Sequence, residues 1–186
     1  MSSTHEELRA IALAEFARAG YAATSLQRIA ELAGLSKSSV LYHFASKEAL
    51  LEAAISPALE RFETMVDRME LSHSRDEFIE DFVNLILEHT LEVHMFVNQG
   101  PSLEDVLVFD RANALAVRLA AHVATTTDSA TERMRFGVAL GGVAYMMASQ
   151  QQYQVVPAAS NDETRVALIT IVTELLSPVP LRSTAP

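Results

Sequence analysis

A short polar run between residues 37 and 47 carries side-chain types that bind DNA. Lys37, Ser38 and Ser39 are consecutive, and Tyr42 and His43 follow about one helical turn later. Lysine and hydroxyl groups hydrogen-bond phosphate oxygens, and at the start of a helix in the major groove they also reach base edges. The alternative is an ordinary three-helix packing motif in which the same side chains are only solvated.

No arrangement of residues predicts catalysis, a cofactor or a metal site. The 186 residues include no cysteine, which excludes a thiolate zinc site, an iron–sulfur cluster and a catalytic thiol. His89 and His94 are five positions apart, so they fall on different faces of a helix. The sequence also lacks a Gly-rich phosphate loop, a nucleophile elbow and an HExxH motif. We therefore expect a protein that is not an enzyme.

Two short helices must position the polar run. Apolar residues at three- and four-residue spacing predict helices over residues 26–33 and 37–43. Gly34 stands where a left-handed residue ends the first helix. Ala30 is small where the two helices approach, and Val40 packs across the corner. This spacing is typical of a helix-turn-helix, which places its second helix in the major groove.

The rest of the chain predicts an all-α protein of about nine helices. Further helices are expected over residues 4–19, 47–70, 75–97, 103–125, 129–151 and 162–176. The expected N-terminal capping residues are Thr4, Thr24, Ser36, Ser46, Ser74, Ser129 and Ser160. The predicted organisation is a DNA-binding domain over residues 1–46, an effector-binding and dimerisation domain over residues 47–177, and a flexible tail over residues 178–186.

Residues 8–50 resemble the DNA-binding domain of the tetracycline-repressor-like (TetR) transcriptional regulators. The matching residues are Ile11, Ala14, Phe16, Gly20, Thr24-Ser25, Ile29-Ala30, Ala33-Gly34-Leu35-Ser36-Lys37, Tyr42-His43-Phe44 and Ser46-Lys47-Glu48-Ala49-Leu50. The resemblance implies a homodimer on a pseudo-palindromic operator, released by a small-molecule effector. Ser38 and Leu41 depart from the family, which usually has a small residue or Gly and an aromatic residue there.

The resemblance also implies which residues touch DNA. Phosphate contacts are expected from Thr24, Ser25, Tyr42, His43 and Lys47, base-edge contacts from Lys37, Ser38 and Ser39, and either kind from Arg28. Thr24 has a second explanation as a helix cap, and His43 has one as a residue at a helix C-terminus.

The larger domain is expected to bind an effector and to pair with a second copy. Its candidate effector-binding residues are Phe62, Met65, Phe82, His89, Phe96, Phe109, Asn113, Tyr145, Met146 and Gln150. For any single apolar residue among these, core filling is the competing explanation. Its candidate dimer residues are Gly137, Gly141, Val166, Ile169, Val172 and Leu176. A monomer that buries both helices against its own core is the alternative.

The net charge of −10 is unevenly distributed. Residues 1–50 carry five basic and five acidic residues, whereas residues 51–186 carry nine basic and nineteen acidic ones. Acidity therefore does not argue against DNA, and the two lysines of the chain, Lys37 and Lys47, bracket the second short helix. We expect a cytoplasmic, ligand-responsive regulator, most simply a repressor. The alternatives are a helical carrier or enzyme that uses the larger domain, and a DNA-binding activator or architectural dimer without an effector.

Overall fold

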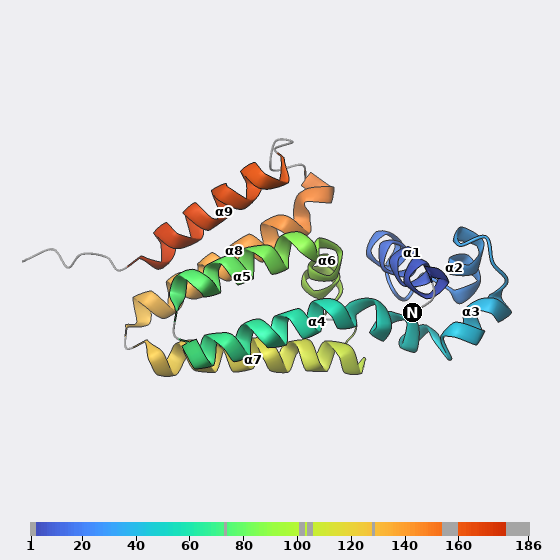
Figure 1. Cartoon of the computed structure of the whole chain (residues 1–186), viewed down its shortest axis with the longest axis horizontal. Coiled ribbons are helices and arrows are strands. Elements are labelled where there is room, and N and C mark those ends of the chain that lie inside the picture. The colour runs from blue at the N-terminus through green and yellow to red at the C-terminus, as the bar shows by residue number, and fades with distance from the viewer. Residues whose placement is uncertain are drawn as a thin grey trace, which may run out of the picture.

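The computed structural model describes residues 3–72, 74–100, 103, 106–127, 129–153 and 160–177. Within these ranges the chain is all-α, as predicted, and no strand occurs (Figure 1). The helices are α1 (Ser3–Ala19), α2 (Leu26–Leu32), α3 (Lys37–His43), α4 (Lys47–Ser72), α5 (Arg75–Glu88), α6 (Thr90–Gln99), α7 (Leu107–Thr126), α8 (Ala130–Tyr153) and α9 (Asn161–Leu176). The predicted tail over residues 178–186 lies outside the described residues.

Helices α1, α2 and α3 form a small bundle at one end of the molecule (Figure 1). Its interior is closed by fully buried apolar side chains from every element: Leu8, Phe16, Ile29, Val40 and Leu50. Because Leu50 belongs to α4, that helix begins inside the small bundle and then continues into the larger one. The recognition-type helix α3 is therefore attached to the larger bundle through one continuous helix.

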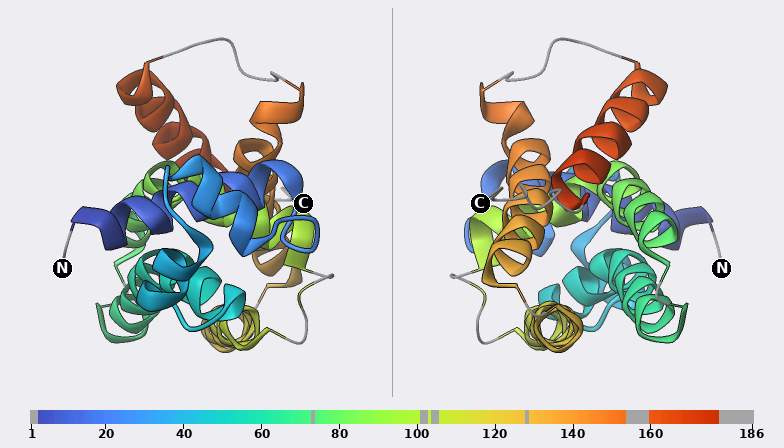
Figure 2. Two further views of the ribbon diagram at one scale, coloured as in Figure 1. Left: turned by 90° about the vertical axis from the view of Figure 1, so that its right-hand side faces the viewer. Right: turned by 90° about the vertical axis from the view of Figure 1, so that its left-hand side faces the viewer.

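The larger bundle has α8 and α9 on one side and α4 and α7 on the other, with α5 between them (Figure 2). Helix α5 packs against α4, α8 and α9, so most of its circumference is covered. This explains its nearly continuous apolar sequence, in which Phe78, Phe82 and Ile86 are all buried.

The single helix predicted over residues 75–97 is wrong. The backbone breaks at His89, whose φ of −123° and ψ of 41° lie outside the helical region, and α6 starts anew at Thr90. Neither glycine nor proline stands near residue 89, so the sequence offered no local sign of a break.

Most of the predicted helix caps are confirmed. Ser36, Ser74 and Ser160 each accept a hydrogen bond from a backbone N–H in the first helical turn, and Ser160 forms a full capping box with Glu163. Thr24 is not the cap of α2, because Ser25 occupies that position and accepts from the N–H of Arg28 at 3.1 Å. The error is one residue, and it releases the Thr24 hydroxyl for another contact.

Candidate nucleic-acid interface and cavity

The turn between α2 and α3 has the geometry that its sequence predicts. Gly34 has a φ of +66°, a left-handed conformation that favours glycine. The N–H of Leu35 donates to the carbonyl of Ala30 at 2.8 Å, and the N–H of Gly34 donates to Glu31 at 3.2 Å. These two bonds close a Schellman motif, which fixes the angle at which α3 leaves α2.

The first turn of α3 presents Lys37 and Ser38 to solvent. The hydroxyl of Ser36 accepts from the backbone N–H of Ser39 at 3.1 Å. It also lies 2.8 Å from each of the hydroxyls of Ser38 and Ser39. Both predicted serines are therefore oriented by the cap of their own helix.

The last turn of α3 exposes an aromatic side chain. Tyr42 is 87% exposed, the most exposed of the large hydrophobic side chains in the described part of the chain. Its ring meets that of His43 edge-on at 5.4 Å between centroids, and His43 in turn lies 6.3 Å from the ring of His5 on α1. Hence His43 is half-buried between helices, while Tyr42 is free to reach a partner.

Thr24 and Lys47 are engaged inside the protein. Thr24 is buried, and its hydroxyl donates to the carbonyl of Gly20 at 2.9 Å. The ammonium of Lys47 donates to the carbonyls of Tyr21 and Thr24 at 3.0 and 3.1 Å, and it lies 4.1 Å from the centre of the Tyr21 ring. The two side chains thereby hold the turn over residues 20–24, which leads into α2.

Arg28 lies on the surface of α2 and pairs with α1. Its guanidinium is 3.3 Å from the buried carboxylate of Glu15, which also accepts two hydrogen bonds from Arg18. The hydrogen bonds from Arg18 are the main reason why the pKa of Glu15 lies below its ordinary value, with burial opposing and Arg28 assisting. Ser25, the neighbour of this pair, is exposed and caps α2.

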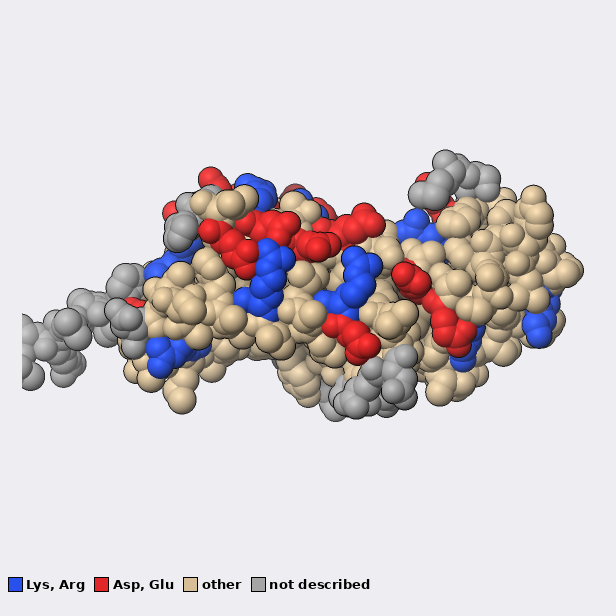
Figure 3. Space-filling model, turned by 90° about the horizontal axis from the view of Figure 1, so that it is seen from below, with Lys and Arg blue, Asp and Glu red and all other residues tan. Residues whose placement is uncertain are grey.

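Lys37 differs from these cations, because no hydrogen bond or ion pair of the described residues involves its ammonium. Acidic side chains gather over the larger bundle, whereas the end of the molecule formed by α1–α3 shows few of them (Figure 3). On the face seen in Figure 3, a polyanion therefore meets less repulsion at this end of the molecule than over the larger bundle.

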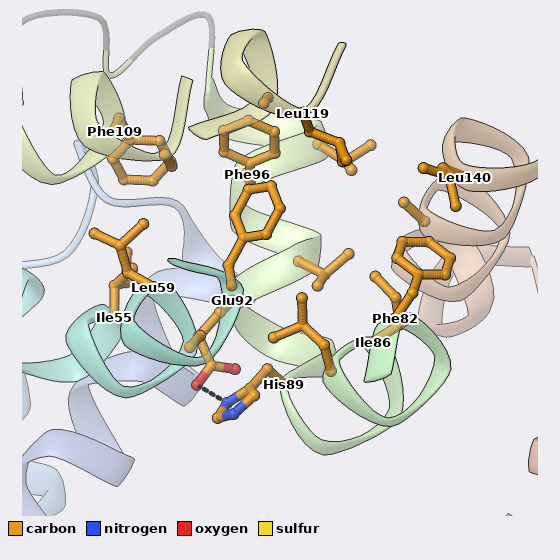
Figure 4. Close-up of a pocket in the computed structure, with 18 of the residues that line it drawn as sticks. Ile55, Leu59, Phe82, Ile86, His89, Glu92, Phe96, Phe109, Leu119 and Leu140 are labelled. Atoms are coloured by element: carbon orange, nitrogen blue, oxygen red, sulfur yellow. Dashed lines mark hydrogen bonds and ion pairs between the residues drawn. The ribbon is translucent and has the colours of Figure 1, made fainter. Parts of the chain in front are cut away.

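A cavity of about 460 Å³ lies in the larger bundle between α4, α5, α6, α7 and α8 (Figure 4). Six of the predicted effector residues line it: Phe62, Phe82, His89, Phe96, Phe109 and Tyr145. Met65 belongs to the packed core instead, Met146 packs against that core, and Asn113 is exposed on α7. The side chain of Gln150 lies outside the described residues.

Sequence reasoning missed Glu92 and most of the aliphatic lining. A straight helix over residues 75–97 would carry Glu92 one turn after Glu88, on a polar stripe of that helix. The break at His89 turns α6 so that Glu92 joins the cavity wall, where its Oε1 lies 3.2 Å from Nδ1 of His89. The pair lies on the opposite side of the cavity from Phe109 and Leu119 (Figure 4).

Helix α6 connects this cavity to the small bundle. Gln99, at the end of α6, donates from Nε2 to the carbonyl of Phe16 at 2.9 Å and accepts the N–H of Tyr21 at 3.0 Å. Its two bonds flank Gly20, whose φ of +89° ends α1. The turn over residues 20–24 is therefore held both by α6, through Gln99, and by α4, through Lys47.

The predicted dimer residues fall into two groups. Val172 and Leu176 are buried within the chain, against a core that includes α5, and Ile169 is half-buried beside them. Val166, Gly137 and Gly141 are exposed, and no atom lies within 4 Å of a Cβ built on either glycine. Other exposed apolar side chains on α8 and α9 are Met134, Val138, Tyr145 and Ile171.

In the described part of the chain, no cluster of three or more His, Asp or Glu residues could hold a metal ion. No described helix is long and apolar enough to cross a membrane.

Comparison with known proteins identifies the small bundle. Residues 8–54 match the family model of bacterial regulatory proteins of the tetR family. The transcriptional regulator RutR of Escherichia coli K12 is 33% identical over 88 residues, which cover 47% of this chain and 42% of RutR. The matched segment is therefore less than half of that relative.

Solved structures extend the likeness to the whole fold. The ketosteroid transcriptional regulator KstR2 of Mycobacterium tuberculosis superposes with a TM-score of 0.68 at 17% identity, covering 94% of this chain and 95% of KstR2. SCO3833, a TetR-family regulator from Streptomyces coelicolor, gives a TM-score of 0.68 at 22% identity, covering 92% and 91%. Both proteins are named as transcriptional regulators, and at these identities the likeness shows that this chain shares their fold.

Proposed function

We propose that the protein regulates transcription by placing α3 in the major groove of an operator, because residues 8–54 match the family model of bacterial regulatory proteins of the tetR family. The observation that carries the proposal is the exposed first turn of α3, where Lys37 stands unpaired among the described residues on a bundle with no acidic excess. We further propose that it acts in the cytoplasm as a repressor.

The predicted contact residues fall into two groups, according to whether their polar atoms are already hydrogen-bonded within the chain. Direct contacts are proposed for the exposed residues Lys37, Ser38, Ser25 and Tyr42, with Ser39, His43 and Arg28 within the same surface. Thr24 and Lys47 are proposed to hold the turn before α2, because their polar atoms are already bonded within the chain. Their effect on DNA would then pass through the position of α2.

The test is the affinity of the protein for the DNA upstream of its own gene. Lys37→Ala should weaken binding about tenfold and reduce the slope of log affinity against log salt by about one. Arg111→Ala is the matched control, since Arg111 lies on α7 beside Glu63. The DNA affinity of this variant should stay within about twofold of wild type. Equal binding by wild type and Lys37→Ala would remove α3 from the interface.

We propose that two copies pair through the exposed face of α8 and α9. The apolar residues Val138 and Val166 are 65% and 62% exposed there, and the space above Gly137 and Gly141 is open to a closely packed partner helix. Two-fold pairing is also what reading two half-sites about 34–36 Å apart requires. Val138→Glu should yield monomers in light scattering, while Leu71→Glu, at a still more exposed site on α4, should not.

We propose that the cavity binds the effector that releases the operator. Its walls include α4 and α6, the two helices that hold the turn over residues 20–24. A ligand that shifts either helix would move this turn and, with it, α2 and α3. A ligand that binds the cavity and leaves operator affinity unchanged would contradict this part of the proposal.

A further inference from the structure

We infer that the cavity selects a ligand with an apolar body and a single head group that donates hydrogen bonds, neutral or cationic, and that it discriminates against anionic head groups. The inference rests on the proposed function in one respect only, namely that the cavity is a ligand site. It names the chemical class of that ligand from the residues of the wall.

The wall of the cavity is apolar almost throughout. Apart from His89, Glu92 and Tyr145, each lining residue is aliphatic, aromatic or glycine. The rings of Phe96 and Phe109 lie nearly parallel, with centroids 6.4 Å apart. Such a surface binds a ligand by removing apolar area from water, at about 25 cal/mol per Å². The body of the ligand must therefore be hydrophobic.

The polar end of the cavity consists of two linked side chains. The side chains of Glu92 and His89 are only 13% and 19% exposed, and Nδ1 of His89 lies 3.2 Å from Oε1 of Glu92. A buried polar group needs a hydrogen-bond partner, so a ligand that fills the cavity must satisfy whatever the pair leaves open.

What the pair leaves open are acceptors. In the neutral tautomer of His89 that donates from Nδ1 to the Glu92 carboxylate, Nε2 carries a lone pair, and Oε2 of Glu92 has no hydrogen bond among the described residues. Both groups are matched by a hydroxyl or an ammonium and not by a carboxylate. The internal hydrogen bond therefore sets the polarity of the site.

The charges of the cavity wall also favour a neutral or cationic head group. No Lys or Arg is among the described residues of the cavity wall, so with His89 neutral no cation of the wall would pair with an anionic ligand. A carboxylate beside Glu92 would instead place two negative charges together in an apolar surrounding, which is strongly unfavourable. A cationic head would gain the attraction that an anionic one loses.

Three probes with one apolar body test the inference: decylamine, 1-decanol and sodium decanoate. Calorimetric titration of the full chain should give affinities for the amine and the alcohol at least about tenfold higher than for decanoate. In Glu92→Gln the preference for the amine over decanoate should shrink by about tenfold or more. Glu88→Gln is the matched control, because Glu88 is exposed on α5 and does not line the cavity, and it should keep the wild-type preference.

Each outcome bears on one claim. The inference would be overturned by equal affinity for the three probes or by tighter binding of decanoate. It would also be overturned if Glu92→Gln has a wild-type melting temperature and keeps the wild-type preference for the amine over decanoate. Binding of none of the probes at millimolar concentration would also overturn it. If the head-group preference is found while operator affinity stays unchanged by decylamine, the inference holds and the proposed effector release fails.

Discussion

Replacing Gln99 by alanine tests whether α6 holds the DNA-binding bundle in place. The carboxamide forms two hydrogen bonds to the backbone on either side of Gly20, 78 and 83 residues away in sequence. Alanine removes both bonds and keeps the helix, because it is the residue with the highest helix propensity. The perturbation is therefore confined to the contact between α6 and the end of α1.

The two bonds differ in what their loss leaves behind. The carbonyl of Phe16 also accepts the N–H of Gly20 at 3.0 Å, so it keeps one partner. The N–H of Tyr21 has no second partner among the bonds of the described residues, and it must turn to water. With about 0.5–1.5 kcal/mol for each bond, we expect a loss of about 1–3 kcal/mol in the free energy of unfolding. For a chain of this size that loss corresponds to a decrease of about 2–12 °C in the melting temperature.

The assay combines thermal unfolding with operator affinity in the presence and absence of a cavity ligand. In Gln99→Ala the ligand should lower operator affinity less than in wild type, with the coupling free energy reduced by about 1 kcal/mol or more. Asn98→Ala is the control, because Asn98 is exposed and bonds only to His94 of its own helix. A Gln99→Ala protein with wild-type stability and the full ligand response would refute the role of this contact.

Three further outcomes are expected. Burial, assisted by the hydrogen bond to Glu48, raises the pKa of Tyr21 to about 12. Absorbance titration should therefore show one of the four tyrosines ionising at a higher pH than the others. The stability that this group contributes should be lost as pH rises through 10 toward 12. Gly34→Ala should lower the free energy of unfolding by about 1 kcal/mol or more in denaturant titration, since its φ is +66°. The hydrogen bond from Arg118 lowers the pKa of Glu70, so Arg118→Ala should move that pKa upward in an NMR titration. In wild type the interaction stabilises the fold above the lowered pKa of Glu70, and this contribution is lost as pH falls through that pKa. The variant should lack this contribution.

The sequence predicts the small bundle almost residue by residue because its signals are local. Gly34 and Ser36 act within one helical turn of their own positions, so the neighbouring residues in the sequence are enough to predict the turn and the helix cap. The predicted range 37–43 for α3 agrees with the structure at both ends. Thr24 is predicted in place of Ser25 as the cap of α2 because two adjacent residues have the same capping chemistry, and the predicted cap Thr4 lies inside α1.

The larger bundle is harder to predict because its features depend on distant contacts. The break occurs at His89, with no glycine or proline near it to signal it in the sequence. Once α6 has its own direction, Glu92 lines the cavity, whereas Asn113 on α7 is exposed and does not line it. The stripe of α9 that contains Val172 is apolar because it covers α5, and a sequence cannot tell that stripe from a face that pairs with a second chain.

The same break explains how one short helix can serve two sites. If residues 75–99 formed one straight helix, the end that carries Gln99 would follow α5, which is buried between other helices and has little room to move. Because α6 is a separate helix of ten residues, His89 and Glu92 lie at its first turn in the cavity and Gln99 lies at its last turn on the small bundle. A helix of this length spans about 15 Å, so under the proposed function a rigid displacement of α6 at the cavity would reach the turn over residues 20–24. The position of the break, more than the cavity itself, is what would allow binding in the larger bundle to reach α3.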